Sequence, residues 1–163
     1  MRKILALMLL AMAMAGTGPA GAADDDVLRY VSLDTDKAYM RTGPGLRYPV
    51  EWVYVRPGWP FEVVSEYGYW RKLRDIDGTS GWMHMNLLTS RRRVIVTQDV
   101  ASVYAKADTT SRQVALAEGG VVADLVECEG KWCEIRLPRD KEDPIDGYVV
   151  RAALWGAEDI PAK

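Results

Sequence analysis

The sequence has few of the residues on which catalysis and metal binding most often depend. It contains one histidine and two cysteines among 163 residues. A Ser-His-Asp or Cys-His catalytic set therefore has a single candidate base, His84, whose place in the strand-like "GWMHMN" is typical of a surface residue. A zinc site would lack ligands if Cys128 and Cys133 are joined in a disulfide. We expect no catalytic residues, no metal site and no cofactor.

Phosphate-binding and redox motifs are absent as well. The loop "YMRTGPGLRYPV" at 39–50 is rich in glycine, but neither a helix N-terminus nor a Gly-Lys-Ser/Thr motif follows it. The cysteines have four residues between them, which is not the C-x-x-C redox pattern. Asp75 and Asp77 lie beside a glycine and are typical of a turn. We interpret Gly43-Pro44-Gly45 as a structural corner, which is compatible with a loop that also lines a binding groove.

No apolar run is long enough to span a bilayer. Arg2 and Lys3 precede an apolar run at 4–15, and the small residues at 20–22 are typical of a signal-peptide cleavage site. We expect cleavage after Ala22 or Ala23, and hence a periplasmic or secreted protein. The alternative is a membrane anchor that is retained, although no cysteine for lipid attachment lies near the cleavage site.

Sustained helical periodicity is absent, whereas strand patterns are frequent. Short alternating or β-branched runs are separated by glycine or proline, at 51–55, 61–65, 70–73 and 81–84. A sheet of about five such strands must curl to bury its aromatic face, and closure into a barrel removes its exposed edges. The sequence therefore predicts an all-β protein built from small barrels.

An internal repeat indicates two such barrels. Residues 38–50 align with 102–114 so that the final valines coincide, and residues 63–74 align with 125–136 without a gap. The ends of the two units, 85–88 and 151–154, are predicted to be single helical turns. The predicted organisation has six parts: a signal peptide (1–22), an acidic segment (23–36), a first barrel (37–90), a basic linker or strand (91–100), a second barrel (101–156) and a tail (157–163).

Cys128 and Cys133 flank a predicted hairpin turn at Glu129-Gly130. With a four-residue loop the cysteines would face each other within reach of a disulfide, whereas a two-residue turn would leave them on neighbouring pairs. Because exported proteins enter an oxidising compartment, we expect the disulfide to form. It closes a very short loop, so the chain-entropy model gives it a small contribution to stability.

Charge is distributed unevenly along the chain. Residues 37–93 carry ten Lys and Arg against five Asp and Glu, a net charge of +5, and residues 99–163 carry eight against thirteen, a net charge of −5. The basic half, together with Arg91, Arg92 and Arg93, suggests weak contact with an anionic envelope polymer or lipid surface. A solvated surface is the equally open interpretation. We expect no nucleic acid partner.

The first unit resembles the bacterial SH3-like (SH3b) domain. The residues that carry the resemblance are Met40-Arg41-Thr42-Gly43-Pro44-Gly45, then Val50, Gly68-Tyr69-Trp70 and Gly81-Trp82-Met83. Tyr39 replaces the usual asparagine of the family. The second unit keeps Gly130-Lys131-Trp132 and Gly147-Tyr148-Val149 but lacks the Gly-Pro-Gly loop. The resemblance implies two tandem SH3-like barrels that serve as an attachment module.

Aromatic residues crowd the first unit beyond what so small a barrel can bury. Trp70 and Trp82 are expected in the core, from the repeat and the family pattern. Aromatic rings beside cationic groups suit glycan strands or extended peptides. The candidate ligand-binding residues are Arg41, Arg47, Tyr48, Trp52, Tyr54, Trp59 and Tyr69. Packing of the same aromatic residues between the two barrels is the alternative.

The resemblance implies an exported, non-catalytic binding module of the bacterial cell envelope, with peptidoglycan or its stem peptides as ligand. A second hypothesis is a periplasmic protein–protein adaptor or inhibitor that uses the SH3-like groove or a strand edge. A third is self-association, in which the basic half of one molecule meets the acidic half of another.

Overall fold

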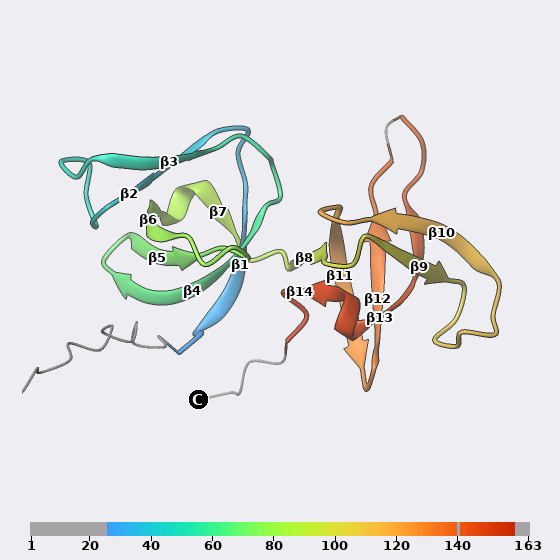
Figure 1. Ribbon diagram of the computed structural model, residues 1–163. Helices are drawn as coiled ribbons and strands as arrows, with labels where there is room; N and C mark the ends of the chain where they lie inside the picture. The colour runs from blue at the N-terminus through green and yellow to red at the C-terminus, as the bar shows by residue number, and fades with distance from the viewer. Residues whose placement is uncertain (1–25, 140, 159–163) are drawn as a thin grey trace, which may run out of the picture.

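The computed structural model describes residues 26–139 and 141–158, and these form two antiparallel β-sheets, one in each half of the chain (Figure 1). The predicted signal peptide with Ala22 and Ala23, and residues 159–163 of the predicted tail, lie outside the described residues. Within the described part of the chain, no helix is long and apolar enough to cross a membrane.

The first sheet, barrel 1, contains seven strands in the order β3-β2-β6-β5-β4-β1-β7. The strands are β1 (Arg29–Leu33), β2 (Ala38–Arg41), β3 (Val50–Tyr54), β4 (Pro60–Tyr67), β5 (Trp70–Arg74), β6 (Ser80–His84) and β7 (Leu88–Thr89). The 3₁₀ turn η1 (Met85–Leu87) connects β6 to β7.

The second sheet, barrel 2, repeats this order as β10-β9-β13-β12-β11-β8-β14. Its strands are β8 (Arg93–Val96), β9 (Val100–Tyr104), β10 (Gln113–Glu118), β11 (Val122–Glu129), β12 (Trp132–Leu137), β13 (Ile145–Val150) and β14 (Leu154–Trp155). The 3₁₀ turn η2 (Arg151–Ala153) occupies the place of η1. The predictions of an all-β class, of two tandem SH3-like barrels and of a single helical turn near the end of each are confirmed.

Each sheet has seven strands rather than about five, because one strand precedes each predicted unit and a two-residue strand follows its 3₁₀ turn. β1 lies in the segment that was predicted to precede the first barrel, and β8 lies in the predicted linker or strand. β1 pairs with β4 on one side and with β7 on the other. Each barrel therefore needs this first strand, because without it the long strand β4 or β11 would have an open edge.

The repeat extends to individual backbone hydrogen bonds. The N–H of Met85 donates to Tyr69 O at 2.8 Å, and the N–H of Arg151 donates to Lys131 O at 2.8 Å. Ala38 pairs with Tyr54, whereas Ala101 pairs with Ala117 in the same position of barrel 2. Ala38 thus corresponds to Ala101, so the predicted alignment of 38–50 with 102–114 is wrong by one residue.

The two barrels have separate hydrophobic cores. The fully buried side chains of the first core are Leu33, Met40, Phe61, Val63, Leu73 and Met83. Those of the second core are smaller and include Val94, Val96, Val103, Cys133, Ile135 and Val149. Each unit therefore buries its own inward-facing positions, as a strand pattern with alternating burial requires.

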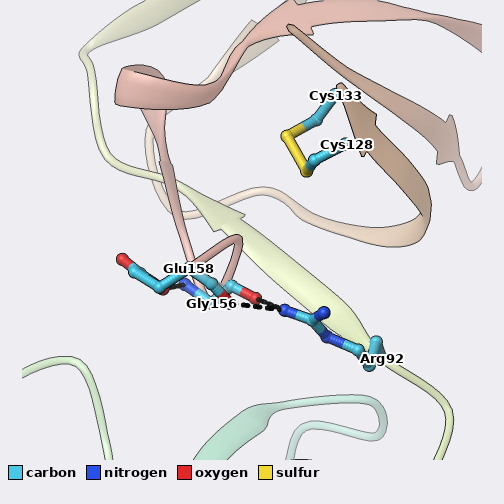
Figure 2. Close-up of a disulfide and its surroundings, with 5 residues drawn as sticks. All are labelled: Arg92, Cys128, Cys133, Gly156 and Glu158. Atoms are coloured by element: carbon cyan, nitrogen blue, oxygen red, sulfur yellow. Dashed lines mark hydrogen bonds between the residues drawn. A yellow bond between two sulfur atoms is a disulfide. The ribbon is translucent and has the colours of Figure 1, made fainter. Parts of the chain in front are cut away.

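The joint between the barrels is built around the ring of Tyr30 on β1. Trp155 meets this ring edge-on with centroids 5.7 Å apart, and the Arg92 guanidinium lies 5.5 Å from the ring centroid. Arg92 also donates hydrogen bonds to Gly156 O at 2.9 Å and to Glu158 O at 3.1 Å (Figure 2). The segment that follows β14 is thereby fastened to the first strand of barrel 1.

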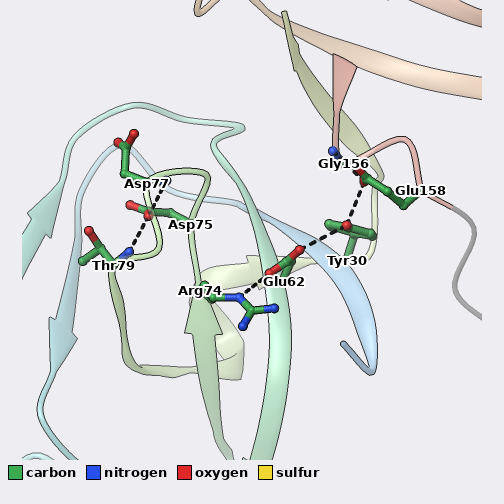
Figure 3. A network of polar contacts seen from close by, with 8 residues as sticks. All are labelled: Tyr30, Glu62, Arg74, Asp75, Asp77, Thr79, Gly156 and Glu158. Carbon is green, nitrogen blue, oxygen red and sulfur yellow. Dashed lines mark hydrogen bonds and ion pairs between the residues drawn. The ribbon is translucent and has the colours of Figure 1, made fainter. Parts of the chain in front are cut away.

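A chain of polar contacts continues from this joint into barrel 1 (Figure 3). The Tyr30 hydroxyl donates to Glu158 Oε2 at 2.8 Å and lies 3.3 Å from Glu62 Oε1. Arg74 Nε donates to Glu62 Oε2 at 2.6 Å. Burial raises the pKa of the Tyr30 phenol above its ordinary range, and the Glu158 carboxylate raises it further. The phenol therefore stays a hydrogen-bond donor at neutral pH.

Cys128 and Cys133 form a disulfide across the β11–β12 hairpin, as predicted (Figure 2). The two cysteines are directly paired, and Glu129 pairs with Trp132, so the connection is the two-residue turn Gly130-Lys131. The expectation that a two-residue turn would leave the cysteines out of register is wrong. It assumed a turn at Glu129-Gly130, whereas the turn lies one residue later.

Replacing both cysteines by alanine is expected to lower the free energy of unfolding by about 2 kcal/mol, because only five positions separate them and the closed loop is short. Denaturant unfolding of the wild type in the absence and presence of reductant, alongside the double variant, measures this difference. Reductant should lower the stability of the wild type and leave that of the variant unchanged. Two free thiols in unfolded, unreduced wild type would contradict the bridge.

Candidate binding surface of barrel 1

The loop between β2 and β3 is held in place by Arg41. The Arg41 guanidinium donates to Tyr48 O at 2.8 Å and to Leu46 O at 3.3 Å. The backbone closes the same loop, since the N–H of Thr42 donates to Pro49 O at 3.1 Å. Arg41, a predicted ligand-binding residue, therefore uses its guanidinium to fix the loop from within.

The Gly-Pro-Gly corner lets the ring of Tyr48 close over the backbone. A Cβ added at Gly43 would lie 2.5 Å from the Tyr48 ring, a distance that no side chain tolerates. Arg47 is exposed at the loop tip, 5.1 Å from the Tyr48 ring centroid, and donates to the Tyr48 hydroxyl at 3.3 Å. The corner is structural, as predicted, and it presents an arginine and a tyrosine together.

Strand register places the next aromatic residues on the outer face of the sheet. Directly paired residues share a face, and Trp82 pairs with Arg41 on one side and Lys72 on the other. The alternate positions of β5 and β6, Leu73 and Met83, are fully buried in the core. Trp82 therefore points away from the core and is only partly buried.

Trp70 and His84 continue this outer face toward the β4–β5 turn. They are directly paired, and their rings meet edge-on with centroids 5.5 Å apart. Tyr69 lies 6.0 Å from the His84 ring. Tyr67 pairs with Trp70, so it lies on the same face. Tyr67 and Tyr69 are 67% and 70% exposed, which leaves both rings open to a ligand.

The β2–β3 loop lies next to this outer face. The Tyr48 hydroxyl raises the pKa of the exposed Arg47 guanidinium through its hydrogen bond, and the charge interaction with Tyr67 adds to the rise. Arg41 pairs with Trp82 and its guanidinium donates to Tyr48 O, so the loop lies beside the outer face of β6. We define the aromatic face as Tyr48, Tyr67, Tyr69, Trp70, Trp82 and His84, with Arg47 at its edge.

The structure separates three predicted ligand-binding residues from this face. Trp52 is 52% exposed but pairs with the buried Met40, so it lies on the inward side of the β2–β3 ribbon. Trp59 packs against the core. Tyr54 meets Phe61 edge-on at 4.9 Å between centroids and is partly buried. Of the predicted set, Arg47, Tyr48 and Tyr69 lie on or beside the aromatic face.

The hydroxyl of Tyr54 makes a hydrogen bond within the protein rather than pointing to a ligand site. It donates to Asp75 Oδ2 at 2.7 Å. Asp75 Oδ1 accepts the N–H groups of Asp77 at 3.0 Å and Thr79 at 2.9 Å (Figure 3). Asp75 therefore organises the β5–β6 turn, as its turn-like sequence predicted. Burial raises the pKa of the Tyr54 phenol above its ordinary range, with the Asp75 hydrogen bond as the second cause.

The ligand-binding residues predicted from the sequence did not include Tyr67, Trp70, Trp82 or His84, although His84 was expected on the surface. Trp70 and Trp82 were expected in the core because the repeat keeps an aromatic residue at each position. Both are partly buried on the outer face instead. The alternation of side chains along β6 would have predicted this. Gly81 and Met83 are the inward positions, so Trp82 and His84 must face outward.

The corresponding surface of barrel 2 keeps its rings but has three glutamates and two lysines, Lys106 and Lys131, around them. Trp132 and Tyr148 occupy the positions of Trp70 and Trp82, as the matching strand pairs show. They line a groove of about 560 Å³ together with three glutamates, Glu127, Glu129 and Glu134. Barrel 2 therefore offers a surface of different chemistry. Within the described residues, no group of three or more His, Cys, Asp or Glu could hold a metal ion.

Comparison with known proteins agrees with this architecture. The family model described as "Bacterial SH3 domain" matches twice, over residues 34–89 and 97–156. No curated protein matches the chain.

Two solved structures from Trichomonas vaginalis are similar to this chain over part of their length. NlpC1 shares 13% identity with a TM-score of 0.35 and covers 82% of this chain and 47% of its own. NlpC2 shares 12% identity with a TM-score of 0.34 and covers 78% of this chain and 47% of its own. The chain thus spans about half the length of these two proteins.

Tyr54→Phe is expected to lower the free energy of unfolding by about 1–2 kcal/mol at pH 7, because it removes the donor to the buried Asp75. The folded-state pKa of this phenol is raised, so its contribution is fully present below the unfolded-state pKa of about 10. It is lost as the pH rises through the folded-state pKa. Urea unfolding of wild type and variant at pH 7 and pH 11 measures both effects.

Tyr69→Phe is the matched control, because Tyr69 is 70% exposed. It should change stability by less than about 0.5 kcal/mol at either pH. Equal stability of wild type and Tyr54→Phe at pH 7 would show that the Asp75 hydrogen bond contributes nothing.

Proposed function

We propose that this chain, which belongs to the bacterial SH3 domain family, is an exported, non-catalytic binding module of the cell envelope that recognises peptidoglycan or its stem peptides. The observation that carries the proposal is the aromatic face of barrel 1. Two of its tyrosines are more than half exposed, and an exposed arginine lies at its edge.

The chemistry of this face suits an extended glycan or peptide. Sugar rings and peptide planes stack on aromatic faces, while hydroxyl and guanidinium groups supply hydrogen bonds at the edges. Trp70 and His84 are held by direct pairing across two strands, so this part of the face is rigid before a ligand arrives. A preorganised surface loses less conformational entropy on binding.

The difference between the barrels supports a single binding face for this ligand. At the positions of Tyr67 and Lys72, barrel 2 carries Glu129 and Glu134, as the matching strand pairs show. Carboxylates beside the rings would repel an anionic envelope polymer. Barrel 1 therefore suits such a ligand better than barrel 2, where the glutamates outnumber the two lysines of the groove.

Co-sedimentation of the mature protein with purified peptidoglycan sacculi, at low and high salt, tests the proposal. Binding that persists at high salt is expected if aromatic stacking dominates, because salt screens only the charged contacts. Absence of binding at both salt concentrations would contradict the proposal.

The double variant Tyr67→Ala/Tyr69→Ala is expected to weaken binding to sacculi roughly tenfold, as loss of exposed aromatic anchors does at other interfaces. Both side chains are largely exposed, so the fold should be unaffected. Trp52→Ala is the matched control, since Trp52 is an exposed aromatic residue on the other side of the ribbon. Weakening by Trp52→Ala alone would place the site on the inward side of the β2–β3 ribbon instead.

A specific observation also favours an adaptor for protein partners as a second candidate. β3 is the last strand of its sheet, and four of its five residues are exposed, among them Val50 and Val53. An apolar edge strand of this kind can accept an extended segment of another protein as an additional strand. If the protein does not bind sacculi, the edge of β3 becomes the candidate site for a protein partner.

A further inference from the structure

A cleft of about 680 Å³ lies between the two barrels. Barrel 1 contributes the loop after β1 and the turn before β4, and barrel 2 contributes β11 and the β12–β13 loop. Ligand sites commonly occur at domain interfaces and have volumes in this range. The cleft shares no residue with the aromatic face.

The charges that line the cleft are balanced. Four are arginines: Arg56, Arg93, Arg136 and Arg139. Four are acidic: Asp34, Asp36, Asp124 and Glu142. A cavity with equal numbers of both signs disfavours a polyanion or a polycation, because each would meet repulsion from half of the lining groups. It suits a ligand that carries both signs itself.

Some of these charges already have protein partners. Arg93 donates to Asp124 at 2.8 Å, and its side chain lies against Gly58, where an added Cβ would be 3.0 Å away. This pair forms part of the contact between the barrels. Arg139 pairs with Glu142, and Arg136 with Asp146, but both pairs are about half exposed and therefore weak.

The remaining charges lie on barrel 1 and have no ion-pair partner within the described residues. Arg56 is held over the ring of Trp59 at 5.2 Å, which fixes its direction without neutralising it. Asp34 and Asp36 also line the cleft, and both side chains are exposed. The cleft therefore presents one cation and two anions that are not joined to each other.

The joint fixes the width of the cleft. Tyr30 lies near the start of β1 and contacts Trp155 and Arg92, whereas the residues that follow β1 line the cleft. The barrels are thus fastened at one end of β1 and leave a cleft at the other. A preformed cleft avoids part of the entropic cost that a flexible pair of domains would pay on binding.

From this arrangement we propose that the cleft is a second binding site, distinct from the aromatic face, for a short zwitterionic peptide. The carboxylate of the ligand binds Arg56 together with Arg136 or Arg139, whose own ion pairs are weak, since the guanidinium fork matches a carboxylate. The ammonium group binds Asp34 and Asp36. The peptide itself lies between the barrels.

Isothermal titration of the mature protein with trialanine and its capped forms tests the site. Trialanine with free termini should bind, and N-acetyl-trialanine or trialanine amide should bind at least fivefold more weakly because each lacks one charge. Equal binding of the doubly capped peptide, or no binding of free trialanine, would overturn the proposal.

Two variants locate the binding in the cleft. Arg56→Gln and the pair Asp34→Asn/Asp36→Asn should each weaken trialanine binding at least fivefold; both alter exposed side chains, so folding should persist. Arg47→Gln, an exposed arginine of the aromatic face, is the matched control and should leave trialanine binding unchanged. Loss of trialanine binding in Arg47→Gln alone would overturn the assignment to the cleft. A wild-type protein that binds trialanine but not sacculi would contradict only the function proposed for the aromatic face.

Discussion

The small interior of barrel 1 constrains the rest of its structure. Its core holds one fully buried aromatic ring, Phe61, surrounded by aliphatic side chains and two methionines. A sheet of this size cannot enclose the other aromatic residues of the unit, so alternation of side chains along each strand sends them outward or to the rim. Trp70, Trp82 and His84 occupy outward positions for this reason. The aromatic face is thus a consequence of limited core volume and strict strand register.

The same backbone carries different chemistry in the second barrel. Hydrogen bonds that tie η1 to the β4–β5 turn recur between η2 and the β11–β12 turn. The side chains at the corresponding surface positions have diverged, so tyrosine and lysine in barrel 1 are replaced by glutamates in barrel 2. The Cys128–Cys133 bridge also occurs in barrel 2, whose core side chains are smaller. The two barrels thus share their backbone contacts, whereas their exposed faces differ.

The joint converts two barrels into one unit with a defined cleft. Tyr30 contributes its ring to Trp155 and Arg92, and its hydroxyl to Glu158, so a single residue serves packing and polar contacts at once. Its position near the start of β1 also explains why the first strand matters. That strand completes barrel 1, carries the joint at one end and leads into the cleft at the other.

The sequence by itself determined the all-β class, the two units, the disulfide and the structural role of the Gly-Pro-Gly corner, because these depend on local patterns and on a repeat visible in the chain. It also pointed to Arg47, Tyr48 and Tyr69. Only the tertiary structure decided that Arg41 fixes a loop, that the Tyr54 hydroxyl donates a hydrogen bond to Asp75, and that Trp70 and Trp82 face outward. Those assignments depend on which residues become neighbours across strands, and a shift of one residue in register exchanges the two faces of a strand. The cleft likewise depends on contacts between residues such as Tyr30 and Glu158, which are far apart in the chain and meet only after both barrels have folded.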